Sequence, residues 1–138
     1  MRNYAMGLVA TVLGLIVLAV SPLVGHHSFD VEFDSQNTRD LVGVVTKIEW
    51  INPHAWLYLN VLEEDGSVEN FAMELGPPYA IVRNNNECCG GWDTSTLNVG
   101  DRITIENVAL ARDGSPKAGA TRDTWLVLDG REEKLTLR

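Results

Sequence analysis

The sequence LVGVVTKIEWINPHAWLYLNVLEEDGSVENFAMEL, residues 41–75, decides the fold. Alternation with a period of two residues dominates its first part, and this is the period of a β-strand and not of a helix. Residues 55–62 are apolar on both faces, as in a buried strand. The pattern predicts strands at 42–50, 55–62 and 68–75. The turn-forming sequence Glu64-Asp65-Gly66 joins the second strand to the third, as in a hairpin. We therefore expect a three-stranded meander.

The residues that follow predict a short helix and further strands. Pro77-Pro78 ends the sheet and begins a helix at 78–83, because proline is tolerated in a first helical turn. Strands are predicted at 97–105 and at 124–128. The second of these closes the sheet, and residues 134–137 complete a terminal hairpin.

Three strands, a helix and two more strands is the element order of the OB-fold, a five-stranded Greek-key barrel. Gly43 in the first strand and Gly100-Asp101 at the entry to the fourth also suit that fold. The sequence thus predicts an all-β, OB-like barrel over residues 41–138, with an open β-sandwich as the alternative.

The N-terminus has the features of an export signal. Arg2 is the only charged residue before Asp30, and it precedes an apolar run from Ala5 to Val20. This run is shorter than the roughly 20 residues that span a bilayer, and no basic cluster follows it. We predict that residues 1–25 are a cleaved signal peptide, with an uncleaved membrane tether as the alternative. Export would place the protein in a bacterial periplasm or outside the cell.

Residues 26–40 are expected to form an arm between the signal peptide and the barrel. The formal net charge of the chain is −8, and loss of Arg2 with the signal peptide makes the mature protein more acidic still. Such a charge repels phosphate backbones and anionic membrane surfaces, and it attracts cations. We therefore expect no nucleic-acid partner and no stable membrane insertion after processing.

The two cysteines, Cys88 and Cys89, are adjacent in the segment NNNECCGG, residues 84–91. In an oxidising compartment they can form a strained disulfide between neighbours. They can equally be two surface thiols, cross-link two chains or belong to a soft metal site. The sequence leaves these alternatives open.

Three histidines give the clearest indication of chemistry: His26 and His27 at the mature N-terminus, and His54 after Asn52-Pro53. Cleavage after Gly25 would join the α-amine and the imidazole of His26 into a chelating pair, with His54 as a third nitrogen ligand. Cleavage one residue earlier would let Gly25-His26-His27 offer an amine, two amides and an imidazole to a square-planar metal. Both arrangements favour copper(II), because nitrogen ligands bind it most tightly among the first-row divalent ions. Copper is therefore the candidate cofactor.

Three carboxylates are candidate supplementary metal ligands: Glu32, Asp34 and Glu74. The competing interpretation is that these carboxylates and the N-terminal histidines are solvated, and that His54 packs against Trp56. Neither interpretation is settled by the sequence.

A second candidate site is a ligand or partner surface made of Trp50, Asn52, Trp56 and Tyr58. Alternation places Trp56 and Tyr58 on one face of the second strand, opposite two leucines. A small domain needs its large side chains inside, so we expect these aromatic residues to pack in the core. An exposed aromatic face, of the kind that OB-folds use for ligands, is the alternative.

No nucleophile elbow, nucleotide-binding glycine loop or zinc-protease motif occurs in the sequence. We therefore expect a non-enzymatic binding protein, for which oxidative copper chemistry is the only credible enzymatic version. The metal-free alternative is an OB-like module that binds a small ligand or a periplasmic partner protein through its aromatic face.

Three segments carry a resemblance to known proteins: His26-His27-Ser28-Phe29, Trp50-Ile51-Asn52-Pro53-His54-Ala55-Trp56 and Glu74-Leu75-Gly76. The chain resembles a family of small exported bacterial proteins of unknown function. The resemblance covers most of the mature chain and implies export and a β fold. It implies no particular activity, and the segment around Cys88-Cys89 is not part of it.

Overall fold

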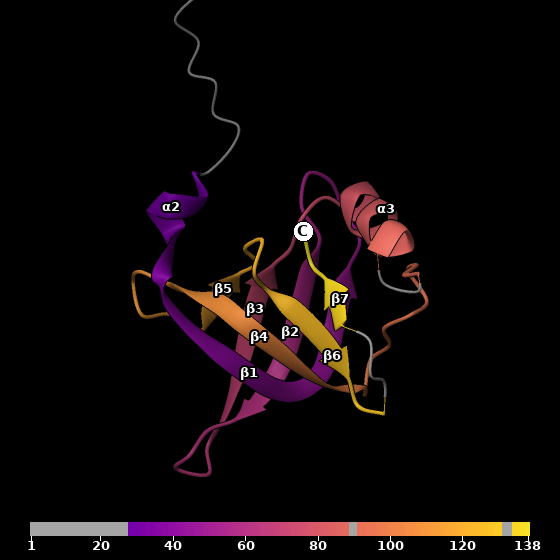
Figure 1. Ribbon diagram of the computed structural model, residues 1–138. Helices are drawn as coiled ribbons and strands as arrows, with labels where there is room; N and C mark the ends of the chain where they lie inside the picture. The colour runs from indigo at the N-terminus through magenta and orange to yellow at the C-terminus, as the bar shows by residue number, and fades with distance from the viewer. Residues whose placement is uncertain (1–27, 89–90, 131–133) are drawn as a thin grey trace, which may run out of the picture.

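A computed structural model describes residues 28–88, 91–130 and 134–138. The elements in these ranges are, in chain order, α2 (Phe29–Glu32), β1 (Phe33–Glu49), β2 (Trp56–Leu62), β3 (Val68–Glu74), α3 (Pro78–Cys88), β4 (Arg102–Ala111), β5 (Lys117–Gly119), β6 (Trp125–Leu128) and β7 (Lys134–Thr136). Figure 1 shows the strands wrapped around one core, with α2 and α3 near the upper end. The signal peptide expected at 1–25 lies outside the described residues. Among the helices that are described, none has the length and apolar character needed to cross a bilayer.

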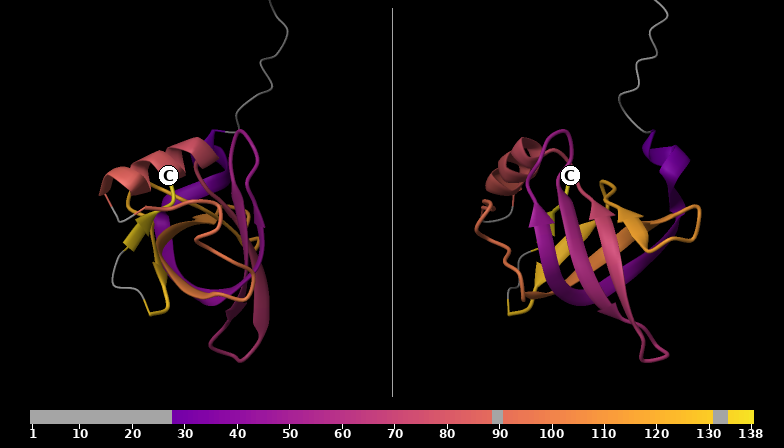
Figure 2. Two further views of the ribbon diagram at one scale, coloured as in Figure 1. Left: turned by 90° about the vertical axis from the view of Figure 1, so that its right-hand side faces the viewer. Right: turned by 180° about the vertical axis from the view of Figure 1, so that it is seen from behind.

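Five strands close into a barrel. Neighbouring strands pair in the order β1-β2-β3-β5-β4, and β4 pairs back to β1. These pairs are antiparallel except for β3 with β5, which is parallel. The left view of Figure 2 looks along this barrel. The mixed five-stranded barrel confirms the OB-like prediction.

The strand that closes the barrel is β5, and the expectation that residues 124–128 do so is wrong. Lys117, Ala118 and Gly119 pair with β3 on one side, and Ala118 and Gly119 pair with β4 on the other. Three residues are too few to show an alternating pattern, so this strand gives no signal in the sequence. The more apolar β6 instead pairs with β4 from Ile103 to Glu106, on the edge opposite β1, and continues into β7 as a hairpin added to the barrel.

β1 begins at Phe33, before the barrel boundary expected at residue 41. Its first half pairs with β4, from Phe33 opposite Ala111 to Val44 opposite Arg102. Its second half pairs with β2, so one long curved strand serves both partners and closes the barrel (Figure 1). The polar sequence at 34–40 conceals the strand because most of its residues are exposed. From Phe33 onward, the expected arm is therefore part of the sheet.

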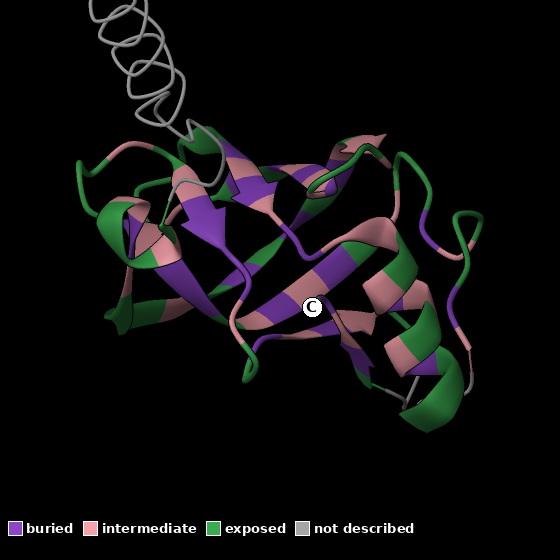
Figure 3. Ribbon diagram, turned by 90° about the horizontal axis from the view of Figure 1, so that it is seen from above, coloured by how far each residue is buried: buried purple, intermediate pink, exposed green. Residues whose placement is uncertain are grey.

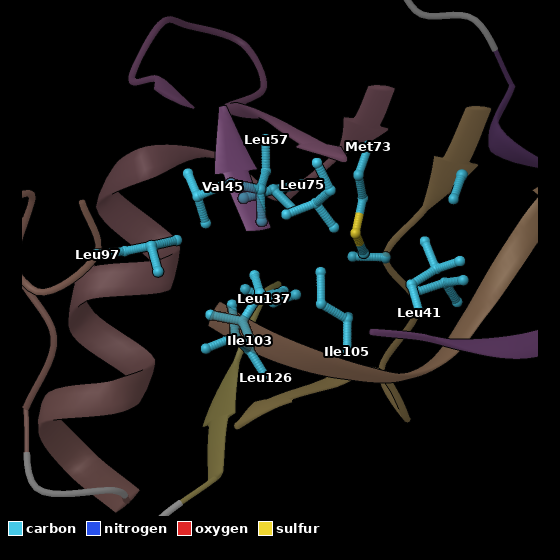
Figure 4. Packing of buried hydrophobic residues seen from close by; sticks show 14 of the residues in the cluster. Leu41, Val45, Leu57, Met73, Leu75, Leu97, Ile103, Ile105, Leu126 and Leu137 are labelled. Carbon is cyan, nitrogen blue, oxygen red and sulfur yellow. The ribbon is translucent and has the colours of Figure 1, made fainter. Parts of the chain in front are cut away.

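The inward face of β1 carries Leu41, Gly43 and Val45, while Val42 and Val44 are 42% and 38% exposed. A register shift after Val45 then turns the strand, so that Ile48 and Trp50 pack against the core. The strict alternation expected over 42–50 is thus broken at this irregularity. Figure 4 shows core side chains from several strands meeting inside the barrel, including Leu57, Met73 and Ile105.

α3 extends to Cys88, beyond the end expected at residue 83, because buried Asn85 attaches the helix to the sheet. The Asn85 side-chain amide donates to the carbonyls of Ile81 and Thr136, each at 2.8 Å, and its oxygen accepts the Thr136 N–H at 2.8 Å. Thr136 lies on β7, so the side chain of Asn85 bonds both the C=O and the N–H of this strand residue. Ile81 is the other buried residue of α3, and Figure 3 shows that the rest of the helix is exposed or half-buried.

Candidate functional site

The loop between β1 and β2 holds His54 beside the end of β3. Ala55 donates its N–H to Gly76 O at 3.1 Å and accepts the N–H of Leu75 at 2.9 Å. The peptide bond between Asn52 and Pro53 is cis. This loop lies at the upper end of the barrel, near α3 (Figure 2).

His54 pairs with Glu74, the last residue of β3. The ring atom Nδ1 contacts Glu74 Oε1, and the His54 and Glu74 side chains are 33% and 16% exposed. Glu74 lies opposite Trp56 in the β2–β3 register. Trp56 is two residues after His54, so this pairing places Glu74 near His54. When a carboxylate accepts the proton of Nδ1, the other ring nitrogen, Nε2, is the atom of the imidazole that binds a metal.

Phe29 reaches the same part of the barrel from α2. Its ring covers Gly119, where an added Cβ would lie 2.8 Å from Phe29 Cζ and 2.8 Å from Phe33 Cδ2. Gly119 is the register partner of Glu74 in the parallel pair of β3 and β5. The guanidinium of Arg138 lies 5.2 Å from the centre of the Phe29 ring. The structure therefore brings residues of the three family-like segments, Phe29, His54 and Glu74, to one end of the barrel.

The remaining sequence-predicted ligands differ in what they contact. His26 and His27 lie outside the described residues. Glu32 pairs with Lys117 at 3.4 Å and Asp34 with Arg112 at 3.3 Å, so each of these carboxylates has a cationic partner. Of the three carboxylates considered, Glu74 is the one that contacts His54, the histidine within the described residues. Within the described ranges, no group of three or more His, Cys, Asp or Glu residues is arranged to hold a metal ion.

The aromatic residues of β2 face outward, so the expectation that they pack in the core is wrong. Leu57 and Leu59 are fully buried, whereas Trp56 and Tyr58 on the opposite face are half-buried. Both faces of this strand are apolar, and alternation alone could not choose the inner one.

The other two members of the candidate surface lie in the loop before β2. Asn52 is exposed. Trp50 packs against the core and meets Trp92 edge-on, with the ring centres 6.0 Å apart. Trp50 therefore has a packing role that the sequence did not distinguish from a surface role.

Lys47 and Glu49 of β1 complete this outer face, and sequence reasoning did not select them. Tyr58 Oη donates to Glu49 Oε2 at 2.8 Å, and Lys47 Nζ lies 2.7 Å from Glu49 Oε1. The Lys47 ammonium is also 5.1 Å from the centre of the Tyr58 ring. Their spacing in the sequence already placed Lys47 and Glu49 on the same face of the predicted first strand.

These contacts shift the pKa values of all three groups. The hydrogen bond from Lys47, followed by that from Tyr58, lowers the pKa of Glu49 below its ordinary 4.5. The same bond to Glu49 raises the pKa of the Tyr58 hydroxyl above 10.0, because ionisation would cost the phenol its proton and place two anions together. The pKa of Lys47 is raised above 10.5 by its bond to Glu49. The polar groups of Lys47, Glu49 and Tyr58 are thus bonded to one another.

Cys88 ends α3 and is disulfide-bonded, which removes the surface-thiol alternative for this residue. Cys89, the other cysteine of the chain, lies outside the described residues.

Comparison with known families identifies the chain's relatives. A family model described as a family of unknown function, DUF6152, matches residues 14–122. The chain belongs to the DUF6152 family. This confirms the resemblance drawn from the three sequence segments. No curated protein and no solved structure matches the chain.

The DUF6152 match extends beyond β5 and ends before β6. It therefore includes all five strands of the barrel and also Phe29, His54 and Glu74 at its upper end. The β6–β7 hairpin follows the matched region.

Proposed function

We propose that this DUF6152 protein is an exported, non-enzymatic binding protein that holds one copper(II) ion, or a similar divalent metal ion, at the upper end of the barrel. The ligands would be His54 and the N-terminal histidines His26 and His27. The observation that carries the proposal is the contact of His54 Nδ1 with Glu74. Its role would be that of a carrier, a buffer or an accessory to a larger metalloprotein.

A histidine that binds a metal through one ring nitrogen commonly donates the proton of the other to a carboxylate, and His54 contacts Glu74 in this way. In such sites the carboxylate accepts the proton of one ring nitrogen, fixes the orientation of the ring and makes the other nitrogen more basic. Nε2 of His54 would then be the ligand atom. Because Glu74 is only 16% exposed, little solvent competes for this hydrogen bond.

The remaining ligands would come from the segment that precedes Ser28, which is the first described residue. Removal of the signal peptide after Gly25 would expose the α-amine of His26 next to its imidazole. An amine and imidazoles are ligands that copper(II) binds strongly. The formal charge of −8 would favour the approach of a cation.

The first experiment measures the intact mass of the exported protein, with and without one equivalent of copper(II). The mass identifies the first residue of the mature chain and the number of bound ions. We expect a chain that begins at His26 and binds one copper ion. A mature chain that begins elsewhere, or one that retains the leader, would contradict the His26 chelate.

Variants then test each ligand by isothermal titration with copper(II). We expect His54→Ala, His26→Ala and three extra residues before His26 each to weaken binding. Three are needed because one or two extra residues would place His27 or His26 third, in the amine, amide and imidazole arrangement that itself binds copper(II). Ile51→Ala is the matched control for His54→Ala, because Ile51 lies in the same loop and is 52% exposed. Full affinity in all three test variants would end the copper proposal. Oxygen- and reductant-dependent turnover that a chelator abolishes would instead favour a copper-dependent enzyme.

A second candidate function is metal-free binding of a small ligand or a periplasmic partner protein on the outer face of β2. The outward position of Trp56 and Tyr58 favours it, because ligands of OB-folds bind on an outer strand face. With chelator present, Trp56→Ala should lose a partner that the unmodified protein retains from a periplasmic extract. Tyr79→Ala, which changes an exposed aromatic residue on α3, is the control. Equal recovery with Trp56→Ala would contradict this function.

A further inference from the structure

The first half of β3, residues 68–71, is an open edge of the sheet. β5 pairs with residues 72–74, and on that side the N–H of Ala72 also bonds Pro116 O at 3.0 Å. Residues 68–71 pair with β2 on one side, and no described strand pairs with them on the other. Alternate residues of an antiparallel strand point their N–H and C=O groups to the same side. The backbone groups of Val68 and Asn70 therefore face the open side, as those of Ala72 do.

This edge lies on the part of the β2–β3 hairpin that extends beyond the barrel. Figure 1 shows the hairpin reaching below β1 and β4, and the right view of Figure 2 shows it from the opposite side. Val68, Glu69 and Asn70 are all exposed. At about 3.4 Å per residue, residues 68–71 offer an edge of roughly 14 Å. A peptide strand bound there would lie in line with β5.

Apolar side chains lie on the outer face of the hairpin beside this edge. Leu62 and Val68 are register partners in the β2–β3 pair, and they are 68% and 62% exposed. An exposed apolar residue on an edge strand favours the addition of another strand, because the open backbone groups and the side chain are covered together. A residue of an added strand that faces outward would pack against Val68.

Carboxylates gather on the other face of the same hairpin. Glu63, Glu64, Asp65 and Glu69 line a recess there, and Arg39 is the only cation among the residues that line it. The guanidinium of Arg39 is bonded to Glu63 at 2.7 Å, so its charge is already balanced. Opposite charges on neighbouring strands are stabilising. A residue of an added strand that faces this recess would therefore be lysine or arginine.

The same carboxylates argue against a second copy of this chain as the occupant. Edge-to-edge pairing of two copies would bring the recess of one chain, with Glu69, close to that of the other. Like charges on paired strands are destabilising, and the net charge of −8 adds repulsion between whole molecules. The charge of this edge fits a basic segment of a different protein.

We propose that residues 68–71 bind an extended segment of a partner protein as an added strand, and that this segment alternates apolar residues with lysine or arginine. Backbone hydrogen bonds with Val68 and Asn70 provide the affinity, and the alternating side chains provide the specificity. The surface uses neither His54 nor a metal ion. It is also separate from the aromatic face, because Trp56 is six residues from the end of β2 at Leu62, about 20 Å along the strand.

The test uses a capped six-residue peptide that alternates lysine and valine, added to the mature protein with chelator present and followed by nuclear magnetic resonance. We expect saturable binding, and amide exchange of Val68 and Asn70 at least about tenfold slower, because their N–H groups enter hydrogen bonds. The same peptide with every backbone nitrogen methylated keeps its side chains and charge but cannot donate, and should not bind. A peptide that alternates glutamate and valine should not bind either.

Variants of the protein test the two parts of the surface separately. Val68→Pro removes an N–H from the open side and none from the β2 ladder, and should weaken peptide affinity about fivefold. Glu69→Lys should weaken it to a similar extent, because the recess loses a negative charge and gains a positive one. Glu87→Lys, at an exposed position of α3, is the matched control with the same change in net charge. Trp56→Ala should bind the peptide normally.

The amide spectrum of each variant reports whether the barrel is intact, and the two control peptides need no variant at all. Binding of the methylated peptide, or equal losses in Glu69→Lys and Glu87→Lys, would mean non-specific attraction to an acidic protein and would overturn the proposal. Protection of amides elsewhere but not at residues 68–71 would overturn it as well. Self-association that protects Val68 and Asn70 without peptide would make a second copy the occupant. None of these outcomes bears on copper binding.

Discussion

Tyr58 donates a hydrogen bond of 2.8 Å to the carboxylate of Glu49, and this bond joins β1 to β2 on the outer face of the barrel. Lys47 binds the other oxygen of the same carboxylate. The three side chains form one charged and aromatic unit beside Trp56, which pairs with Glu49 in the β1–β2 register. Any ligand of the aromatic face would therefore meet a carboxylate whose hydrogen bonds are already made.

The first prediction concerns the ionisation of Tyr58. We expect its pKa to lie above 10.0 and to fall towards 10.0 in Glu49→Gln, because the carboxylate that holds the phenol proton is gone. The stability that this bond contributes is present below pH 10.0 and is lost as the pH rises through the raised pKa. Ultraviolet absorbance titration of the phenol would measure it, in a mature protein whose other tyrosine, Tyr79, is changed to phenylalanine.

Glu69→Gln is the control for this titration, because it removes an exposed carboxylate from β3 and leaves the Tyr58 bond in place. An equal fall in the Tyr58 pKa in both variants would show that overall charge, and not the bond to Glu49, sets the shift.

The second prediction concerns three turns of the form Asp-x-Ser, which begin at Asp65, Asp93 and Asp113. In each turn the serine two positions later donates its hydroxyl to the aspartate at 2.6 Å, and this bond lowers the aspartate pKa below 3.8. The stabilising effect is present above pH 3.8 and is lost as the pH falls through the lowered pKa. We expect Ser67→Ala to raise the pKa of Asp65 towards 3.8, as measured by carboxyl carbon resonances.

Asp113 in the same Ser67→Ala protein serves as the internal control, because its own serine is unchanged. A pKa of Asp65 that stays low after the substitution would assign the shift to the backbone bond from residue 67, which is the second cause.

The sequence predicts β2, β3 and the hairpin between them because two segments of strand length flank the specific turn residues Glu64-Asp65-Gly66. The same hairpin, centred on Asp65, implies that residue 56 lies opposite residue 74, as the structure has it. The pairing of His54 with Glu74 could therefore have been anticipated from the turn. The two residues lie 20 positions apart in the chain, so neither local motif alone indicates the pairing.

Other features have no local signal. β5 has only three residues, and the packing of the Phe29 ring on Gly119 joins segments 90 positions apart in the chain. The irregularity after Val45 depends on how β1 divides its pairing between β4 and β2. These features arise from closure of the barrel, which couples distant residues, and a periodic pattern carries no information about them.

The third prediction concerns Gly43, which the sequence indicated as an OB-like position. A Cβ there would lie 2.7 Å from the carbonyl oxygen of Asn60 on β2, and backbone cannot move aside as a side chain can. We expect Gly43→Ala to lower the free energy of unfolding by about 1–3 kcal/mol, as measured by urea denaturation. Val42→Ala, an exposed change at the neighbouring position, is the control. If Gly43→Ala is as stable as the unmodified protein, β1 and β2 must move apart around the added methyl group without loss of stability.

The fourth prediction concerns Asn85, whose side-chain amide is fully buried. It makes two hydrogen bonds to Thr136 of β7 and one to Ile81 within α3. Asn85→Ala removes the partners of the Thr136 N–H and C=O, and buried backbone groups without partners are costly. We expect a loss of about 2–4 kcal/mol in the free energy of unfolding. Asn86→Ala, at the next and exposed position of the helix, should have little effect. Hydrogen exchange at Thr136 provides a second measurement, because its amide should exchange faster in Asn85→Ala while amides of β2 remain protected. If Asn85→Ala is as stable as Asn86→Ala and Thr136 stays protected, other contacts must hold the β6–β7 hairpin to the barrel.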